Sequence, residues 1–134
     1  MTAGRINPDN MYNSLEFGFS HASVSREGRL LHLAGQVAWD KERNLVGGDD
    51  LAAQTRQCLA NLKEVLASQG ASPADLVRIR TYVVDHGPEK LEPVAGELMA
   101  FYGDVTPAPN TWIGVQALAL PEFLIEIEAT AALP

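Results

Sequence analysis

Two carboxylates lie close together near the end of the chain, in a segment that alternates apolar and polar side chains. Within residues 121–131, Glu126 and Glu128 alternate with Ile125 and Ile127. Successive side chains of a β-strand point to opposite faces, so the alternation places both acids on one face and the isoleucines on the other. A carboxylate in a partly dry pocket has a raised pKa, and it can act as a general base or orient a water molecule. We therefore look for function on the face that carries the acids.

Other residue types that often do chemistry show no comparable pattern. His21, His32 and His86 are scattered, with neither the spacing of metal ligands nor an acid placed to orient a base. Cys58 falls in the apolar stripe of a predicted helix, where a buried structural thiol is expected rather than a nucleophile. We therefore expect no metal site in this protein.

Composition excludes several classes of protein. The chain has 134 residues, which suits a single domain spanning residues 1–134. It carries 17 acids against 10 bases, and the net charge of −7 argues against nucleic acid as a partner. One cysteine cannot form an internal disulfide, residues 1–10 lack the apolar core of a signal peptide, and no apolar run is long enough to cross a membrane. We expect no membrane partner and a cytoplasmic location.

Periodicity and turn residues predict the elements that must position the two acids. Strands are predicted at residues 15–22, 29–38, 76–85, 110–118 and 121–131, with a hairpin turn at residues 25–28. Helices are predicted from Asp49 or Asp50 to about Ser68 and from Gly87 to about Tyr102, with a single turn at residues 72–75. The order of two strands, helix, strand, helix and two strands predicts an α+β fold, a mixed β-sheet with two helices packed on one face.

The other face of this sheet is expected to be bare of helices. Consistent alternation places on it Arg78, Arg80, Tyr82, Glu126 and Glu128, together with His32, Gln36, Trp112 and Gln116. A face on which aromatic rings lie among paired charges is more typical of an assembly interface than of a wetted surface. We therefore expect the chain to form oligomers.

Several segments of the chain resemble the RidA/YjgF family, and together they cover nearly its whole length. Residues 33–37, Leu-Ala-Gly-Gln-Val, are similar to the family's Ser-Gly-Gln-[Ile/Val] strand. Residues 57–66 followed by residues 75–85 resemble its central helix and strand, and residues 113–115 and 125–129 are similar to its C-terminal signature.

The resemblance implies a chorismate-mutase-like fold and a homotrimer. In such a trimer the bare sheet faces pack into a central barrel, with a ligand pocket between each pair of protomers. It further implies hydrolysis of a reactive imine or enamine, which releases ammonia and a keto acid without a cofactor. The partners implied are a small-molecule metabolite and further copies of the same chain.

The resemblance also implies site residues, some of which depart from the family pattern. The family pocket uses an Arg for the substrate carboxylate, a Glu for the attacking water, a Gly backbone group, and commonly a Tyr and a Ser. Gly35 and Glu126 are retained, whereas Asn110 stands in place of the Arg, Ala34 in place of the Ser and Phe19 in place of the Tyr. An amide cannot reproduce the charge-assisted, bidentate bond that a guanidinium makes with a carboxylate.

The charged candidates each have a structural alternative. Glu126 is the predicted catalytic residue, but it would also suit a salt bridge in the barrel. Glu128 is better explained by a cross-strand pair with Arg78 or Arg80, worth roughly 0.2–1 kcal/mol in an open sheet. Arg80 or Arg78 is a candidate to replace the missing Arg as an anion clamp, with the ion pair as the simpler interpretation.

The uncharged candidates have alternatives of the same kind. Asn110 is a candidate ligand for substrate or only the first residue of a strand, and Trp112 is a candidate pocket wall or part of an interface. Gly35 suits close approach of the backbone to a ligand, and it also suits plain packing.

Three functions are therefore weighed. The first is a hydrolase or deaminase acting on an imine, enamine or related metabolite. The second is a non-catalytic, metabolite-binding or regulatory trimer of the same fold. The third is an endoribonuclease or translation inhibitor, which the acidic charge disfavours.

Overall fold

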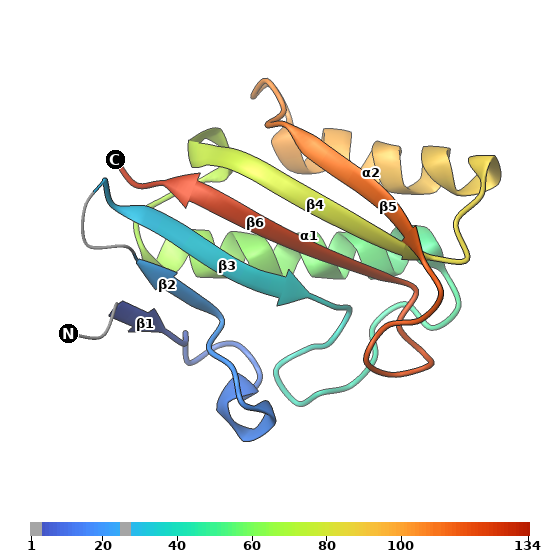
Figure 1. The fold of residues 1–134 in the computed structure, drawn as a ribbon, viewed down its shortest axis with the longest axis horizontal. Helices are drawn as coiled ribbons and strands as arrows, with labels where there is room; N and C mark the ends of the chain where they lie inside the picture. The colour runs from blue at the N-terminus through green and yellow to red at the C-terminus, as the bar shows by residue number, and fades with distance from the viewer. Residues whose placement is uncertain (1–3, 25–27) are drawn as a thin grey trace.

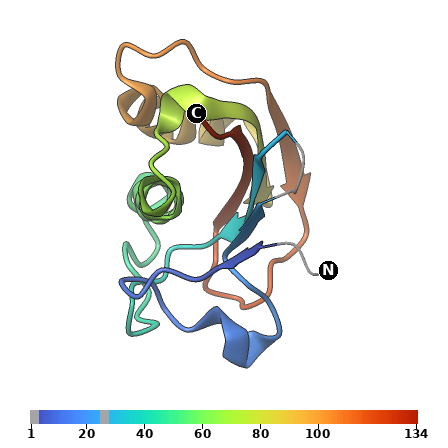
Figure 2. The same ribbon diagram turned by 90° about the vertical axis from the view of Figure 1, so that its left-hand side faces the viewer.

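The strand that carries the two acids lies inside a six-stranded sheet, and two helices cover one face of that sheet (Figures 1 and 2). The computed structural model describes residues 4–24 and 28–134. The strand order across the sheet is β1-β2-β3-β6-β4-β5. The strands are β1 (Gly4–Ile6), β2 (Ala22–Val24), β3 (Leu30–Gln36), β4 (Leu76–Val84), β5 (Asn110–Val115) and β6 (Ile125–Ala132). The helices are α1 (Leu51–Ser68) and α2 (Leu91–Tyr102), with short 3-10 turns η1 (Ser14–Phe17), η2 (Pro73–Asp75) and η3 (Pro88–Lys90).

The direction of the strands explains why both helices lie on the same face. β6 runs antiparallel to β3 on one side and to β4 on the other, so β3 and β4 are parallel to each other. β5 pairs with β4 in parallel. α1 therefore connects β3 to β4, and α2 connects β4 to β5, in the same direction across the sheet. Because such crossovers are almost always right-handed, two that proceed in one direction place their helices on one face, as the fold prediction requires.

Burial along β6 follows the predicted alternation. Ile125 and Ile127 are fully buried against the helices, whereas Glu126 and Glu128 are only partly buried and face away from the helices. Burying an isoleucine contributes roughly 1.5–3 kcal/mol, and a slip of one residue in register would bury the acids instead. The apolar face of β6 therefore fixes which way the acids point.

The helix α1 begins and ends as its sequence predicts. The Asp50 side chain caps it by accepting a hydrogen bond of 3.2 Å from the backbone N–H of Ala53. Gly70, just beyond its end, has a φ of +70°, a conformation that favours glycine. The predicted turn before β4 is also confirmed, because Ser72 and Asp75 form a capping box.

The strand predicted at residues 15–22 is wrong. Ser14–Phe17 forms η1, whose cap Asn13 accepts a hydrogen bond from Leu15 N–H at 3.1 Å, and Gly18 ends this turn with a φ of +84°. Local side-chain bonds of this kind compete with strand formation. The strand that pairs with β3 is the short β2, and β1 was not predicted. Of the turn predicted at residues 25–28, residues 25–27 lie outside the described part of the chain.

Two irregularities in the sheet overturn predictions of facing. The register between β4 and β6 shifts between Leu76 and Arg78, so Leu76 is buried and Val77 is 44% exposed, the reverse of the predicted phase. The register between β3 and β6 shifts between Leu33 and Gln36. Gln36 is therefore fully buried on the helix side, and its predicted place on the bare face is wrong. Bulges change strand phase without a strong sequence signal.

The side chains of the edge strand β5 also point to other faces than predicted. Trp112 pairs with Thr81, which is buried on the helix side, so the ring of Trp112 packs against the core. Its predicted position on the bare face is wrong. Gln116 was predicted on the same face, but it lies beyond the end of β5.

Candidate functional site

Glu126 rests directly on the backbone of Gly35, across the boundary between β6 and β3. A methyl group added to Gly35 would stand 2.8 Å from Cδ of Glu126 and 3.2 Å from its Oε1. A methyl group there would force the Glu126 side chain to turn aside, so glycine lets this carboxyl rest against β3. The predicted approach at Gly35 was that of a ligand, whereas the group that lies against it here is the carboxyl of Glu126.

The Glu126 carboxylate is unusual because it is partly buried and uncompensated. The structure records no hydrogen bond or ion pair between it and any described residue. Burial raises the pKa of Glu126 above its ordinary value, and the negative charge of Glu128 raises it further. Burial also raises the pKa of Tyr12 to about 12, and the charge of Glu126 adds to that shift. Glu126 is therefore a stronger base than an ordinary surface carboxylate.

Glu128, two residues along the same strand, is in a different environment. Its Oε1 lies 3.5 Å from Nη1 of Arg80, and the hydroxyl of Tyr82 donates a hydrogen bond to the same oxygen. The predicted cross-strand ion pair is confirmed, with Arg80 as the partner. The two acids that the sequence places side by side are therefore one paired and one unpaired carboxylate.

Two amide side chains of α1 hold the chain on both sides of Glu126. Gln54 Nε2 donates to the carbonyls of Gly48 and Glu122 at 2.8 and 2.9 Å, and its Oε1 accepts from the N–H of Leu124 at 3.0 Å. Asn61 Nδ2 donates to the carbonyls of Val37 and Trp39 at 3.0 and 2.9 Å.

These amides fasten the segment entering β6 and the segment leaving β3 to one rigid helix. Sequence analysis missed both Gln54 and Asn61. The available signal was two amides seven residues apart, at buried positions of a helix stripe that is mostly apolar.

An aromatic cluster lies close to this end of the sheet. Tyr12 packs edge-to-face on His21 and Trp39, with ring centroids 4.7 and 5.3 Å apart, and Trp39 packs in the same way on Phe123 at 5.3 Å. Phe19 lies 6.1 Å from the His21 ring and is 36% exposed. Its exposed ring is available to line a ligand pocket, as the resemblance implies for the residue at this position.

His21 is a structural residue of this cluster. Its Nδ1 lies 3.1 Å from Nε2 of Gln36, and its Nε2 lies 2.9 Å from the carbonyl oxygen of Tyr12. An amide NH₂ only donates and a carbonyl only accepts, so the ring is neutral and carries its proton on Nε2. Burial accordingly lowers the pKa of His21. Among the residues that the structure describes, no group of three His, Cys, Asp or Glu side chains is placed to hold a metal ion.

The remaining predicted site residues divide between the two faces of the sheet. Ala34 precedes Gly35 and donates its N–H to the carbonyl of His21 at 2.7 Å. Asn110 lies opposite Ile79 on the helix side, where its Oδ1 accepts a hydrogen bond of 3.1 Å from Thr81. Asn110 and Trp112 are therefore not gathered around Glu126 within one chain.

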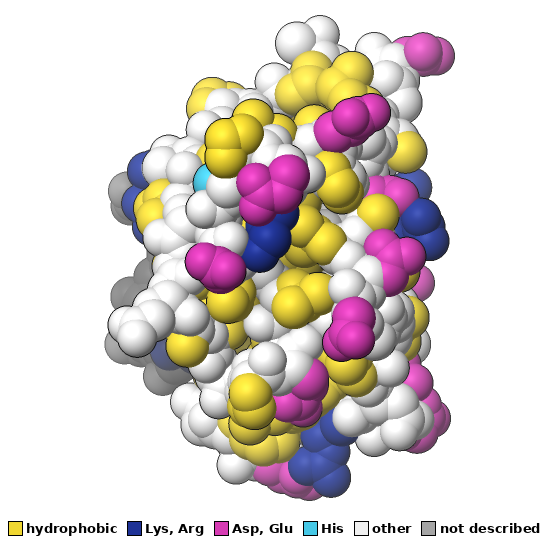
Figure 3. Space-filling model, turned by 90° about the vertical axis from the view of Figure 1, so that its right-hand side faces the viewer, with side chains coloured by type: hydrophobic (Ala, Val, Ile, Leu, Met, Phe, Trp, Pro, Cys, Tyr) yellow, Lys and Arg dark blue, Asp and Glu magenta, His cyan; other side chains and the backbone are white. Residues whose placement is uncertain are grey.

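The end of the molecule at which β6 begins carries acidic side chains scattered among hydrophobic ones (Figure 3). No helix in residues 4–24 or 28–134 is both long and apolar enough to cross a membrane.

Comparison with known proteins places the chain in a family. Residues 12–133 match the family model described as endoribonuclease L-PSP. A RutC family protein of Pyrococcus horikoshii is 32% identical over 113 residues, which make up 83% of this chain and 85% of that protein.

Solved structures agree with this match. A protein of unknown function from the conserved Rid protein family of Yersinia pestis is 61% identical, with a TM-score of 0.77 over 99% of this chain and 100% of that one. A Mycobacterium tuberculosis member of the highly conserved YjgF/YER057c/UK114 family is 32% identical, with a TM-score of 0.74 over 98% of each chain. These likenesses confirm the predicted chorismate-mutase-like fold. The chain belongs to the RidA/YjgF family.

Proposed function

We propose that the protein is a hydrolase that deaminates a small imine, enamine or related metabolite at a pocket built around Glu126. The observation that carries the proposal is the environment of this carboxylate. Glu126 is partly buried, lies against Gly35 and has no counter-charge among the described residues. An acid held in this way is a better proton acceptor than an ordinary carboxylate, because its pKa is raised.

The proposed reaction follows from the two protonation states of Glu126. The Glu126 carboxylate takes a proton from a water molecule while the water oxygen forms a bond to the imine carbon, and Glu126 then gives this proton to the imine nitrogen, which yields a carbinolamine. The carboxylate next takes the hydroxyl proton of the carbinolamine and passes it to the nitrogen as the C–N bond breaks, so that the C=O bond forms and ammonia leaves. One imine and one water thus give one carbonyl compound and one ammonia, with no electron donor or acceptor.

The assembly proposed for this function is a homotrimer whose uncovered sheet faces pack into a central barrel. The uncovered face carries Ile113, which is 40% exposed, and large apolar side chains are exposed elsewhere at Leu15, Phe17 and Leu120. Scattered apolar side chains are common on protein surfaces, so the support for the assembly is the sheet face that the two helices leave uncovered (Figure 2). Sedimentation velocity is expected to give the mass of three chains, and a monomer at micromolar concentration would contradict the assembly.

The second candidate function is a metabolite-binding trimer without catalysis. Two substitutions favour it. Ala34 has no hydroxyl at the position of the family Ser, and Asn110 replaces the Arg and is turned toward the helix side. Arg80, the other cation considered for a substrate carboxylate, is paired with Glu128.

Replacement of Glu126 separates the two functions. Ammonia release from freshly generated 2-iminobutyrate and 2-aminoacrylate is expected to fall about 100-fold or more in Glu126→Gln, because general acid–base catalysis contributes about 10²–10⁴-fold. The matched control is Glu128→Gln, which is expected to stay within a few-fold of the unmodified protein. Activity should fall at acidic pH, as the raised pKa of Glu126 is crossed and the base becomes protonated.

Equal rates for Glu126→Gln and the unmodified protein would remove Glu126 from the mechanism. An unmodified protein that binds small molecules but releases ammonia no faster than buffer would establish the second function.

Replacement of Gly35 by Ala tests the contact that positions Glu126. The added methyl group overlaps the Glu126 carboxyl, the free end of a side chain that can turn aside, so the free energy of unfolding should fall by no more than about 1 kcal/mol, the lower end of the range for overpacking. The control is Gly4→Ala in β1, where an added Cβ meets nothing within 4 Å. Urea denaturation of the double variant Gly35→Ala/Glu126→Ala should recover most of the loss, because the overlapping side chain is removed. A double variant as unstable as Gly35→Ala would show that the glycine is needed for another reason.

A further inference from the structure

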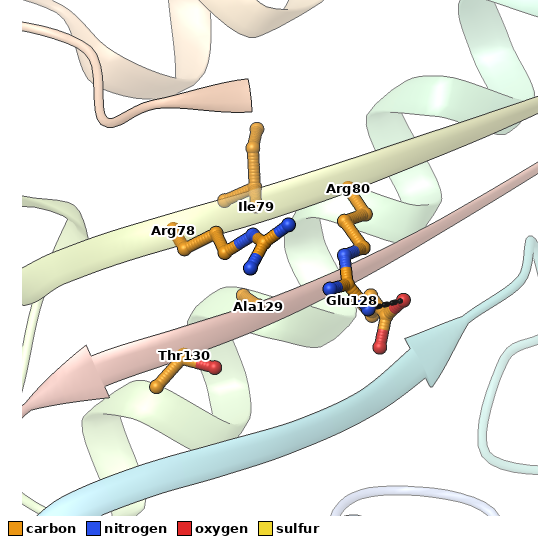
Figure 4. A pocket seen from close by; sticks show the side chains of 6 residues that line it. All are labelled: Arg78, Ile79, Arg80, Glu128, Ala129 and Thr130. Atoms are coloured by element: carbon orange, nitrogen blue, oxygen red, sulfur yellow. Dashed lines mark ion pairs between the residues drawn. The ribbon is translucent and has the colours of Figure 1, made fainter. Parts of the chain in front are cut away.

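A pocket opens on the uncovered face of the sheet, beside the Glu128 ion pair and apart from Glu126, and in the proposed trimer this face lines the interior of the barrel. It has a volume of about 100 Å³ and is lined by Arg78, Ile79 and Arg80 of β4 and by Glu128, Ala129 and Thr130 of β6 (Figure 4). Glu126 does not line it. The pocket lies beyond the Tyr82–Glu128 hydrogen bond, which stands between it and the Gly35–Glu126 contact.

Sheet register directs two guanidinium groups into this pocket. Arg78 lies opposite Thr130 and Arg80 opposite Glu128, so both arginines project from the same face of β4. Figure 4 shows Arg80 extending from β4 over β6 to Glu128, Arg78 running alongside β4 with its guanidinium between the two strands, and the Thr130 hydroxyl facing the same space. Two guanidinium groups, each with five N–H donors, and one hydroxyl therefore line this small pocket.

The charges in the pocket are unbalanced. Arg78 forms no ion pair or hydrogen bond with any residue that the structure describes. Arg80 has a long contact of 3.5 Å to Oε1 of Glu128, an oxygen that also accepts from the hydroxyl of Tyr82, and Arg80 interacts with that hydroxyl as well. Two positive groups thus face one carboxylate that is already partly occupied, in a protein whose net charge is −7. His32, opposite Thr130 on β3, is the adjacent titratable neighbour on this face.

We propose that Arg78, Arg80 and Thr130 form a binding site for a small oxyanion, either a phosphate group or a short carboxylate. Arginine binds both groups through paired N–H donors, and such charge-assisted bonds are about twice as strong as neutral ones. At about 100 Å³ the pocket is small, which suits one oxyanion group. The site is separate from the proposed chemistry at Glu126.

Calorimetric titration of the full chain at constant ionic strength tests the site, with inorganic phosphate and acetate as separate probes and chloride as the background salt. At least one probe should bind saturably, at about one anion per chain, and the stronger of the two identifies the preferred group. Arg78→Gln should weaken this binding at least about tenfold, because a hydrogen bond to a charged group is lost.

Two further variants distinguish specific binding at this site from general attraction between the anion and positive charges. Glu128→Gln removes the carboxylate that competes for Arg80, so it should tighten binding several-fold. Arg56→Gln, the matched control, removes an exposed arginine of α1 that pairs with Glu97 away from the pocket, so it should leave binding unchanged.

Three results would overturn the proposal. They are the absence of saturable binding for both probes, equal weakening by Arg78→Gln and Arg56→Gln, and a stoichiometry of one anion per three chains. The last result would place the anion on an axis shared by three copies instead of in a pocket of each chain.

Discussion

The burial of one face of β6 is the constraint on which the rest of this structure depends. β6 is hydrogen-bonded on both sides, and its isoleucines and alanines are packed under the two helices. A shift of one residue in register would turn those side chains toward the uncovered face. The side chains of Glu126, Glu128 and Thr130 therefore lie on the opposite face of the sheet. The candidate site at Glu126 and the proposed anion pocket therefore lie next to each other on this face of β6.

Glu126 and Glu128 differ because the groups around them differ. Glu128 meets Arg80 and Tyr82 of β4, and these donors satisfy it. Glu126 meets the backbone of Gly35 on the other side, where a bulged β3 offers it no donor among the described residues. A carboxylate that is partly removed from water and lacks a partner holds its proton to higher pH. Gln54 and Asn61 keep the segments around it in place, so its position is a property of α1 as well as of the sheet.

The sequence predicts those features of the structure that are determined within one segment of the chain, and it does not predict those that depend on a neighbouring strand. α1, β4 and β6 were predictable because periodicity and capping residues lie within each segment, whereas the order of the strands across the sheet was not predicted. The bulge at Gly35 and the shift after Leu76 were not predictable, since a change of phase depends on the neighbouring strand. Trp112 was misplaced for the same reason, because its facing follows from parallel pairing with β4. The role of Gln54 depends on Glu122, 68 residues away, and no local pattern records such a contact.

The raised pKa of Glu126 is the central claim, and a titration of its side-chain carboxyl carbon by ¹³C NMR tests it most directly. The resonance can be assigned by its loss in Glu126→Gln. The account predicts a midpoint clearly above the ordinary glutamate value of about 4.3, because burial and the neighbouring charge both favour the protonated form. A midpoint at or below about 4.3 would contradict it, since Glu126 would then be an ordinary, well-solvated or paired carboxylate.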